Sequence, residues 1–142
     1  MNDPIAGYGW YIKLIDNALA KEANHNLQSH NLTMQQNRVL ILLSHAPQMT
    51  LSLKELESHF DAAQSTVAGL VTRLERRGLI EGFADPGDKR VKLVRLTQEG
   101  LLLHQASRQD VVNSEKRPTS LLTEEEKEQF LRLLEKVYEA VK

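Results

Sequence analysis

The side chains of this sequence that are best suited to binding chemistry are basic, and they are concentrated between residues 64 and 97. This stretch holds seven positive and four negative side chains, whereas the rest of the chain holds 11 positive and 15 negative ones. A formal net charge of −1 still allows a positive face, because the acidic remainder can point away from a polyanion. The distribution therefore indicates a nucleic-acid partner. The seven basic residues are Arg73, Arg76, Arg77, Lys89, Arg90, Lys92 and Arg95.

The three arginines at 73–77 fall on the second of two predicted helices. Ser52 and Glu55 have the spacing of a capping box and predict a short helix over 53–59. After a brief turn, a second helix over 64–77 ends before Gly78, where a glycine commonly follows a helix. A short helix, a tight turn and a longer basic helix form a helix-turn-helix, whose second helix fits the major groove of duplex DNA. Four apolar residues should face inward from this second helix: Val67, Leu70, Val71 and Leu74.

Two groups of side chains on the helix over 64–77 are candidate DNA contacts. Polar residues at its start can reach base edges or phosphates, and the arginines further along can neutralise phosphates. In the alternative interpretation the arginines are the solvated face of an ordinary helix. The candidate residues are Gln64, Ser65, Thr66, Arg73, Arg76 and Arg77.

After Gly78 the pattern changes to short β-prone runs at 80–84 and 90–96. A proline followed by a glycine separates them over 85–88, and this predicts a type II turn because glycine accepts the positive φ required there. The resulting hairpin is called the wing below. Narrow minor grooves attract arginine, so the wing tip is suited to the groove beside the helix; a solvated tip without this role is the alternative. The candidate residues of the wing are Lys89, Arg90 and Lys92.

The segments on either side of this unit are predicted to be helices with apolar stripes. Apolar residues three and four positions apart indicate a helix over 5–28 and another after Thr123. Thr33 and Thr97 are expected to cap two further helices, and Thr123 is expected to form a capping box with Glu126.

The predicted fold is mainly α with a small β-hairpin (α+β), arranged as a winged helix-turn-helix. We expect a single domain over 1–142 in which residues 32–97 form the DNA-binding lobe. The stripes on 1–31 and 98–142 have little else to cover them, so these segments are predicted to be dimerisation helices of a homodimer.

The residues of the lobe resemble those of the MarR (multiple-antibiotic-resistance regulator) family. The stretch from Ser65 to Ile80 is similar to the recognition helix of that family. The run from Asp85 to Arg90, followed by Leu96, Thr97 and Gly100, resembles its wing signature. Helix order and spacing extend the likeness over nearly all of the chain.

This resemblance implies a dimeric, ligand-responsive transcription repressor on pseudo-palindromic duplex DNA. It implies that Arg90 enters the minor groove and that Asp88 helps to hold the wing. It also implies a small aromatic effector that binds between the dimer region and the lobe. Trp10 and Tyr11 are candidates to line such an effector site, and packing in the dimer interface is their alternative role.

Three positions depart from the family pattern. Gly82 stands where relatives often carry an arginine, which removes an expected phosphate contact. Ala63 stands where a capping side chain is usual, so either Asp61 caps the helix over 64–77 or its cap is weak. Gly69 lies inside that helix, where glycine costs about 1 kcal/mol relative to alanine, and a close approach of the DNA backbone would explain it.

Other classes of function find little support. The five histidines lack metal-ligand spacing and there is no cysteine, so no metal site is predicted. Three glutamates at 124–126 fall in the first turn of a helix, where they complement its dipole. No phosphate loop or nucleophile motif occurs, so neither an enzyme nor a cofactor is predicted. A winged fold used only for protein contacts remains the alternative function.

We expect a cytoplasmic protein with no membrane partner. No apolar run approaches the length of about 18 residues that spans a bilayer. The first residues also lack the basic and then apolar pattern of a signal peptide.

Overall fold

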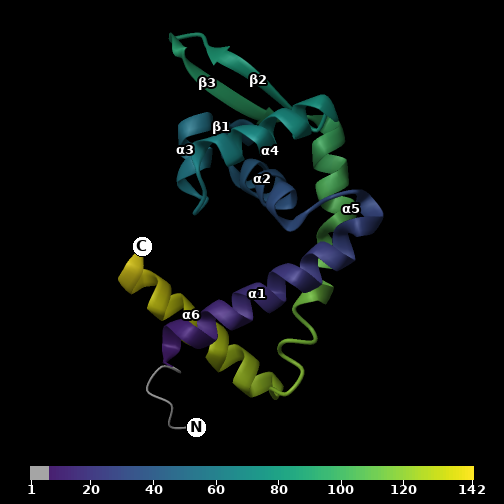
Figure 1. Ribbon diagram of the computed structural model, residues 1–142, viewed down its shortest axis with the longest axis vertical. Coiled ribbons are helices and arrows are strands. Elements are labelled where there is room, and N and C mark those ends of the chain that lie inside the picture. The colour runs from purple at the N-terminus through teal and green to yellow at the C-terminus, as the bar shows by residue number, and fades with distance from the viewer. Residues whose placement is uncertain (1–6) are drawn as a thin grey trace.

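The computed structural model describes residues 7–142 and has the predicted fold, mainly helical with a small antiparallel sheet (Figure 1). The lobe with the wing lies at one end, and α5 runs from it toward α1 and α6 at the other end. No helix within this part of the chain is both long and apolar enough to cross a bilayer. The elements are α1 (Tyr8–Leu27), η1 (Gln28–His30), α2 (Met34–His45), η2 (Pro47–Met49), β1 (Thr50–Ser52), α3 (Leu53–Ser58), α4 (Gln64–Arg76), β2 (Ile80–Asp85), β3 (Asp88–Leu96), α5 (Gln98–Ser114) and α6 (Glu124–Val141).

Side-chain caps set the start of three helices as the sequence predicts. Thr33 and Gln36 form a full capping box at the start of α2. Thr123 and Glu126 do the same for α6. Thr97 caps α5 by accepting a hydrogen bond in its first turn. These bonds satisfy backbone N–H groups that a helix start leaves without partners.

A third strand, which the sequence analysis did not predict, ties the wing to the lobe. β1 pairs antiparallel with β3, so that the sheet order is β1-β3-β2. Ser52 ends β1 and caps α3 by accepting a hydrogen bond from the Glu55 N–H at 3.0 Å. The capping box predicted here is only half formed, because within residues 7–142 the Glu55 side chain makes no return bond.

The turn at the wing tip is not type II, contrary to the prediction. Gly87 is not among the described residues with positive φ, and a type II turn requires that conformation. Instead the Asp85 carboxylate accepts a hydrogen bond from the Gly87 N–H at 2.9 Å, the pattern of an Asx turn. The strand register shifts beside this turn, from Ala84 opposite Lys92 to Asp85 opposite Asp88. Residues 89–91 of β3 therefore protrude from the regular ladder.

The hydrophobic core lies within the lobe and positions α4. All four residues predicted to face inward from α4 are buried: Val67, Leu70, Val71 and Leu74. They pack in one cluster with apolar residues of α2, β2 and β3. Gly78 follows the helix with φ +71°, the left-handed conformation that favours glycine. The core thus fixes which face of α4 points to solvent.

The outer helices leave an apolar surface open in a single chain. α6 has no buried residue, and α1 buries only Ala23 and Leu27. The apolar stripes predicted for these helices are therefore left largely uncovered within one protomer. Ile5, the first residue of the predicted stripe, lies outside the described residues. The exposed apolar residues on α1 and α6 are Tyr8, Trp10, Tyr11, Ile12, Leu14, Ile15, Leu131, Leu133, Leu134, Val137, Tyr138 and Val141.

His104 lies at the contact between α5 and α2. Its Nε2 is 3.4 Å from the Ser44 hydroxyl, whose own hydrogen is donated to the Ile41 carbonyl. The other ring nitrogen is Nδ1. That atom is buried without a partner among the described residues. Burial lowers the pKa of His104, and the charges of His45 and Arg108 lower it further.

We expect His104 to make the protein less stable as the pH falls. The unfolded chain binds a proton at His104 near the ordinary pKa of about 6.5, whereas the folded chain does so only at lower pH. The stability contributed by the neutral ring is present above the unfolded pKa and is lost as pH falls toward the folded pKa. Denaturant titrations give the free energy of unfolding at about pH 7.5 and at about pH 5.5. Between these two conditions it should fall less in His104→Gln than in the wild type. An equal loss in both proteins would contradict this assignment.

Candidate nucleic-acid interface

The start of α4 presents polar side chains without partners. Gln64, Ser65 and Thr66 are all exposed, and within residues 7–142 their side chains make no hydrogen bonds. The N-cap residue is Ala63, and no side chain caps the helix, so Asp61 does not replace the missing cap. An uncapped helix start offers backbone N–H groups and the positive end of the helix dipole to a phosphate.

Arg73 and Arg76 continue this exposed face toward the end of α4. Neither forms an ion pair or hydrogen bond with any other described residue, so both remain available to phosphates. A Cβ added at Gly69 would meet only the end of the Arg73 side chain, at 3.5 Å. Packing within the chain therefore does not require glycine at position 69.

Arg77 is held differently from the other two arginines. Its Nη1 donates to the Asn31 carbonyl at 2.7 Å, and its Nη2 donates to the His30 carbonyl at 3.2 Å. The structure brings Arg77 to the turn between α1 and α2, whereas the sequence analysis placed it among the phosphate contacts.

The wing tip is organised around Asp88. The carboxylate accepts hydrogen bonds from the Arg90 backbone N–H and Nε at 3.1 Å and from Nη2 at 3.2 Å. The Arg90 side chain and then its backbone N–H lower the pKa of Asp88, so the carboxylate stays ionised at neutral pH. The side chain of Arg90 is nevertheless 91% exposed. Lys89 beside it has no partner among the described residues and is exposed.

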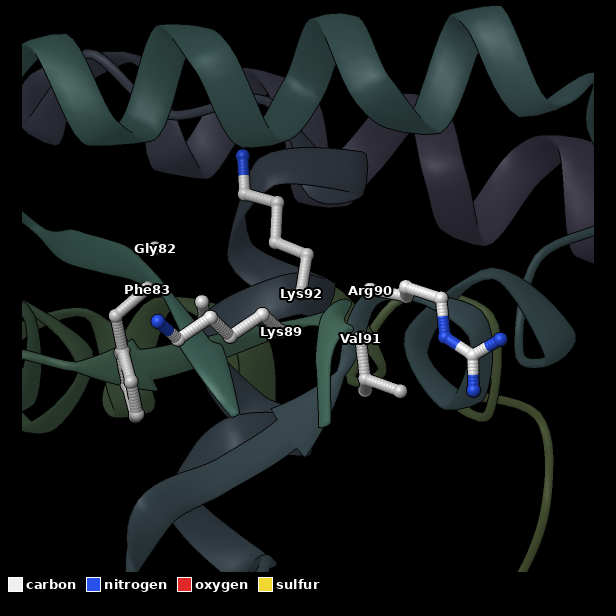
Figure 2. A pocket seen from close by; sticks show the side chains of 7 residues that line it. Gly82, Phe83, Lys89, Arg90, Val91 and Lys92 are labelled. Carbon is white, nitrogen blue, oxygen red and sulfur yellow. The ribbon is translucent and has the colours of Figure 1, made fainter. Parts of the chain in front are cut away.

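Lys92 points away from the tip, toward the helix (Figure 2). Its ammonium lies 3.1 Å from the Glu75 carboxylate of α4, which ties the wing to that helix. A Cβ at Gly82 would lie 2.7 Å from Lys92 Cε, so the glycine makes room for this crossing. Gly82 also lines a shallow hollow of about 320 Å³ with Phe83 and the basic tip residues. At position 82, where the resemblance implied a phosphate-binding arginine, the glycine thus leaves room for an ion pair within the chain.

The comparisons with known proteins agree with this arrangement. Residues 32–92 match the model of the MarR family. Over 109 residues, 77% of this chain and 72% of the relative, the sequence is 28% identical to the homoprotocatechuate degradative operon repressor of Escherichia coli. The apo form of MarR from E. coli has a TM-score of 0.84 at 26% identity, covering 95% of this chain and 98% of that one. Residues 32–92 form a MarR-family domain.

A protein whose structure was solved in complex with DNA has the same fold. The S. aureus MepR–DNA complex matches with a TM-score of 0.79 and 27% identity, over 95% of this chain and 98% of that one. The likeness covers the outer helices as well as the lobe, so it extends beyond the part that the family model matches.

One organised pair on the wing of this MarR-family domain was not predicted from the sequence. The Arg95 guanidinium lies over the Phe83 ring, 4.7 Å from its centroid, and is also hydrogen-bonded to Glu81 on the neighbouring strand. Glu81 and Arg95 are directly opposite one another in the ladder, where opposite charges stabilise a strand pair. The alternation of charges along both strands predicts this pair, but only once the register of β2 against β3 is known.

The aromatic candidates for an effector site lie far from the lobe within one chain. Trp10 and Tyr11 are in the first part of α1, at the end of that helix away from the lobe (Figure 1). A hollow of about 770 Å³ lies further along α1 and is lined by Leu14, Ile15, Ala18, Lys21, Glu22, His25, Arg117 and Pro118. The described residues contain no group of three possible metal ligands.

Proposed function

We propose that this MarR-family protein is a sequence-specific transcription repressor that binds pseudo-palindromic duplex DNA as a homodimer. α4 enters the major groove and the wing reaches the neighbouring minor groove. The observation that carries the proposal is the exposed, unpaired series of polar and basic residues along α4, next to the protruding tip at Lys89 and Arg90. One relative is named as an operon repressor, and MepR was solved with DNA, which supports the same role here.

The dimer follows from the open apolar faces of the outer helices. Soluble monomers rarely expose large contiguous apolar patches, and α6 buries no residue within its own chain. A two-fold dimer would present two copies of α4 to successive major grooves, roughly 34 Å apart.

A small aromatic effector belongs to the same proposal. The E. coli relative is named for an operon that degrades homoprotocatechuate, an aromatic acid, which supports this class of ligand. An effector acts only if it binds one dimer geometry more tightly than the other, with a coupling of typically 1–3 kcal/mol.

The alternative, a winged fold that binds proteins without specific DNA binding, does not account for the wing tip. Lys89 and Arg90 protrude from the ladder at a bulge, with Asp88 ordering the Arg90 side chain. A protein adaptor has no need of this basic tip, whereas a minor groove attracts it.

Replacing Arg90 by alanine should weaken specific DNA binding by about 1–3 kcal/mol per subunit. The plot of log affinity against log salt should also become shallower, by about 0.9 for each lost phosphate contact. Fluorescence anisotropy at several salt concentrations measures both quantities. The matched control is Lys136→Ala, which removes a charge from the polar face of α6 and should leave both unchanged. If Arg90→Ala binds with wild-type affinity and slope, the proposed role of the wing is wrong.

A further inference from the structure

The end of α4 meets the start of α5 in a tight backbone contact, called the pivot below. Thr97 donates its hydroxyl to the Gly78 carbonyl at 2.6 Å and its N–H to the Leu79 carbonyl at 3.1 Å. A Cβ at Gly100 would lie 2.0 Å from the Leu79 carbonyl oxygen. This contact fixes where the end of α4 lies along α5, but it does not by itself fix the angle between the lobe and α5.

A second contact joins α4 to the outer helices through the turn at residues 28–31. Arg77 donates to the carbonyls of His30 and Asn31, two consecutive residues of that turn. Asn31 has φ +53°, so the chain reverses sharply here between α1 and α2. The planar guanidinium can bridge two carbonyl groups at once, which an ammonium holds less well.

α5 holds the same turn from the other side. His30 Nε2 lies 2.8 Å from the Asp110 carboxylate, and both side chains are about three-quarters buried. Asn26, near the end of α1, donates to the Asp110 carbonyl at 3.4 Å. The turn is therefore bonded to the DNA-binding lobe through Arg77 and to the outer helices through Asp110.

The two contacts are well separated along α5. Gly100 and Asp110 are ten residues apart, which corresponds to about 15 Å of helix. Between them α2 packs on α5, where the Ser107 hydroxyl donates to Asn37 Oδ1 at 3.3 Å. The contact at Asp110 lies beyond this packing and farthest from the pivot, where it restricts rotation of the lobe most.

We propose that Arg77 is a positioning residue: through the turn that Asp110 holds from α5, it fixes the angle between the DNA-binding lobe and the outer helices, and it does not bind phosphate. The consequence for DNA binding rests on the proposed function. In a homodimer, the angle between the lobe and the outer helices sets the separation of the two α4 helices. A change in the angle would change which half-site spacing fits.

The angle can be measured without DNA, because the chain has no native cysteine to interfere with labelling. Cysteines placed at Ser65 on α4 and Gln105 on α5, both exposed, carry spin labels. Labelled protein diluted with unlabelled protein reports only the distance within one chain. We expect one narrow distance distribution in the wild type, and a broader or shifted one in Arg77→Met, Arg77→Lys and Asp110→Asn. The matched control Arg76→Met should keep the wild-type distribution.

DNA binding provides the second measurement. In Arg77→Lys the charge remains, so a phosphate contact would be retained, whereas the bridge between two carbonyls is lost. We expect Arg77→Lys and Arg77→Met to keep the wild-type salt slope and to lose the preference for one half-site spacing, whereas Arg76→Met lowers the slope by about 0.9 per subunit. An unchanged distance distribution in Arg77→Met, or a slope lowered as in Arg76→Met, would overturn the inference. Because the distances are measured without DNA, a wild type that binds no specific site refutes the proposed function alone.

Discussion

Glutamate at both Leu133 and Val137 of α6 should convert the protein from a dimer into a monomer. Both side chains are more than half exposed in one chain and lie on the apolar face that the second protomer is proposed to cover. Burying two unpaired carboxylates in that interface is strongly unfavourable. A monomer contacts only one half-site, so its affinity for the operator should fall by about 100-fold or more. Sedimentation analysis gives the oligomeric state, and anisotropy gives the affinity.

The matched control for this variant is Arg132→Gln combined with Lys136→Gln. It changes the net charge by the same amount, but on the polar face of α6. We expect the control to remain a dimer. A Leu133→Glu, Val137→Glu protein that stays dimeric and binds DNA like the wild type would show that α6 is not the interface.

Replacing Gly100 by alanine should be the most destabilising of the single substitutions considered. The new Cβ would lie 2.0 Å from the Leu79 carbonyl oxygen and 3.0 Å from its carbon, and neither can move as a flexible side chain would. Overpacking against backbone costs about 3 kcal/mol, which corresponds to a fall in Tm of about 10 °C in a chain of this size.

Gly9→Ala is the matched control for Gly100→Ala. A Cβ at Gly9 meets nothing within 4 Å, so alanine should stabilise α1 by up to about 1 kcal/mol through its helix propensity. Thermal unfolding followed by circular dichroism compares the two variants. A Gly100→Ala protein as stable as the wild type would mean that the pivot is not a tight contact.

The sequence predicts those features that depend on residues close together in the chain. The predicted caps at the starts of α2, α5 and α6 are formed by Thr33, Thr97 and Thr123. They could be predicted because a cap and its partner are only three residues apart. The buried face of α4 follows from the 3.6-residue period, which places Val67, Leu70, Val71 and Leu74 on one side. The resemblance of the wing also rests on a contiguous run of residues.

Features set by distant partners could not be predicted in the same way. The hydrogen bonds of Arg77 reach residues 46 and 47 positions away, so its sequence neighbours give no sign of them. The Lys92–Glu75 pair depends on the register shift at the wing tip, and no local pattern marks that shift. β1 was missed because three residues are too few to show alternation. A proline-glycine pair favours a type II turn, but the Asp85 side chain stabilises another conformation here.

The most direct test of the account is the affinity of the wild-type protein for the intergenic DNA upstream of its own gene. A scrambled duplex of the same length and composition serves as the control, and both are titrated at several salt concentrations. We predict binding at nanomolar protein, a steep salt slope, and a preference over the control of about a thousandfold or more. Equal weak binding to both duplexes, repeated with duplexes selected from a random pool, would contradict sequence-specific DNA binding and favour a protein partner for the wing.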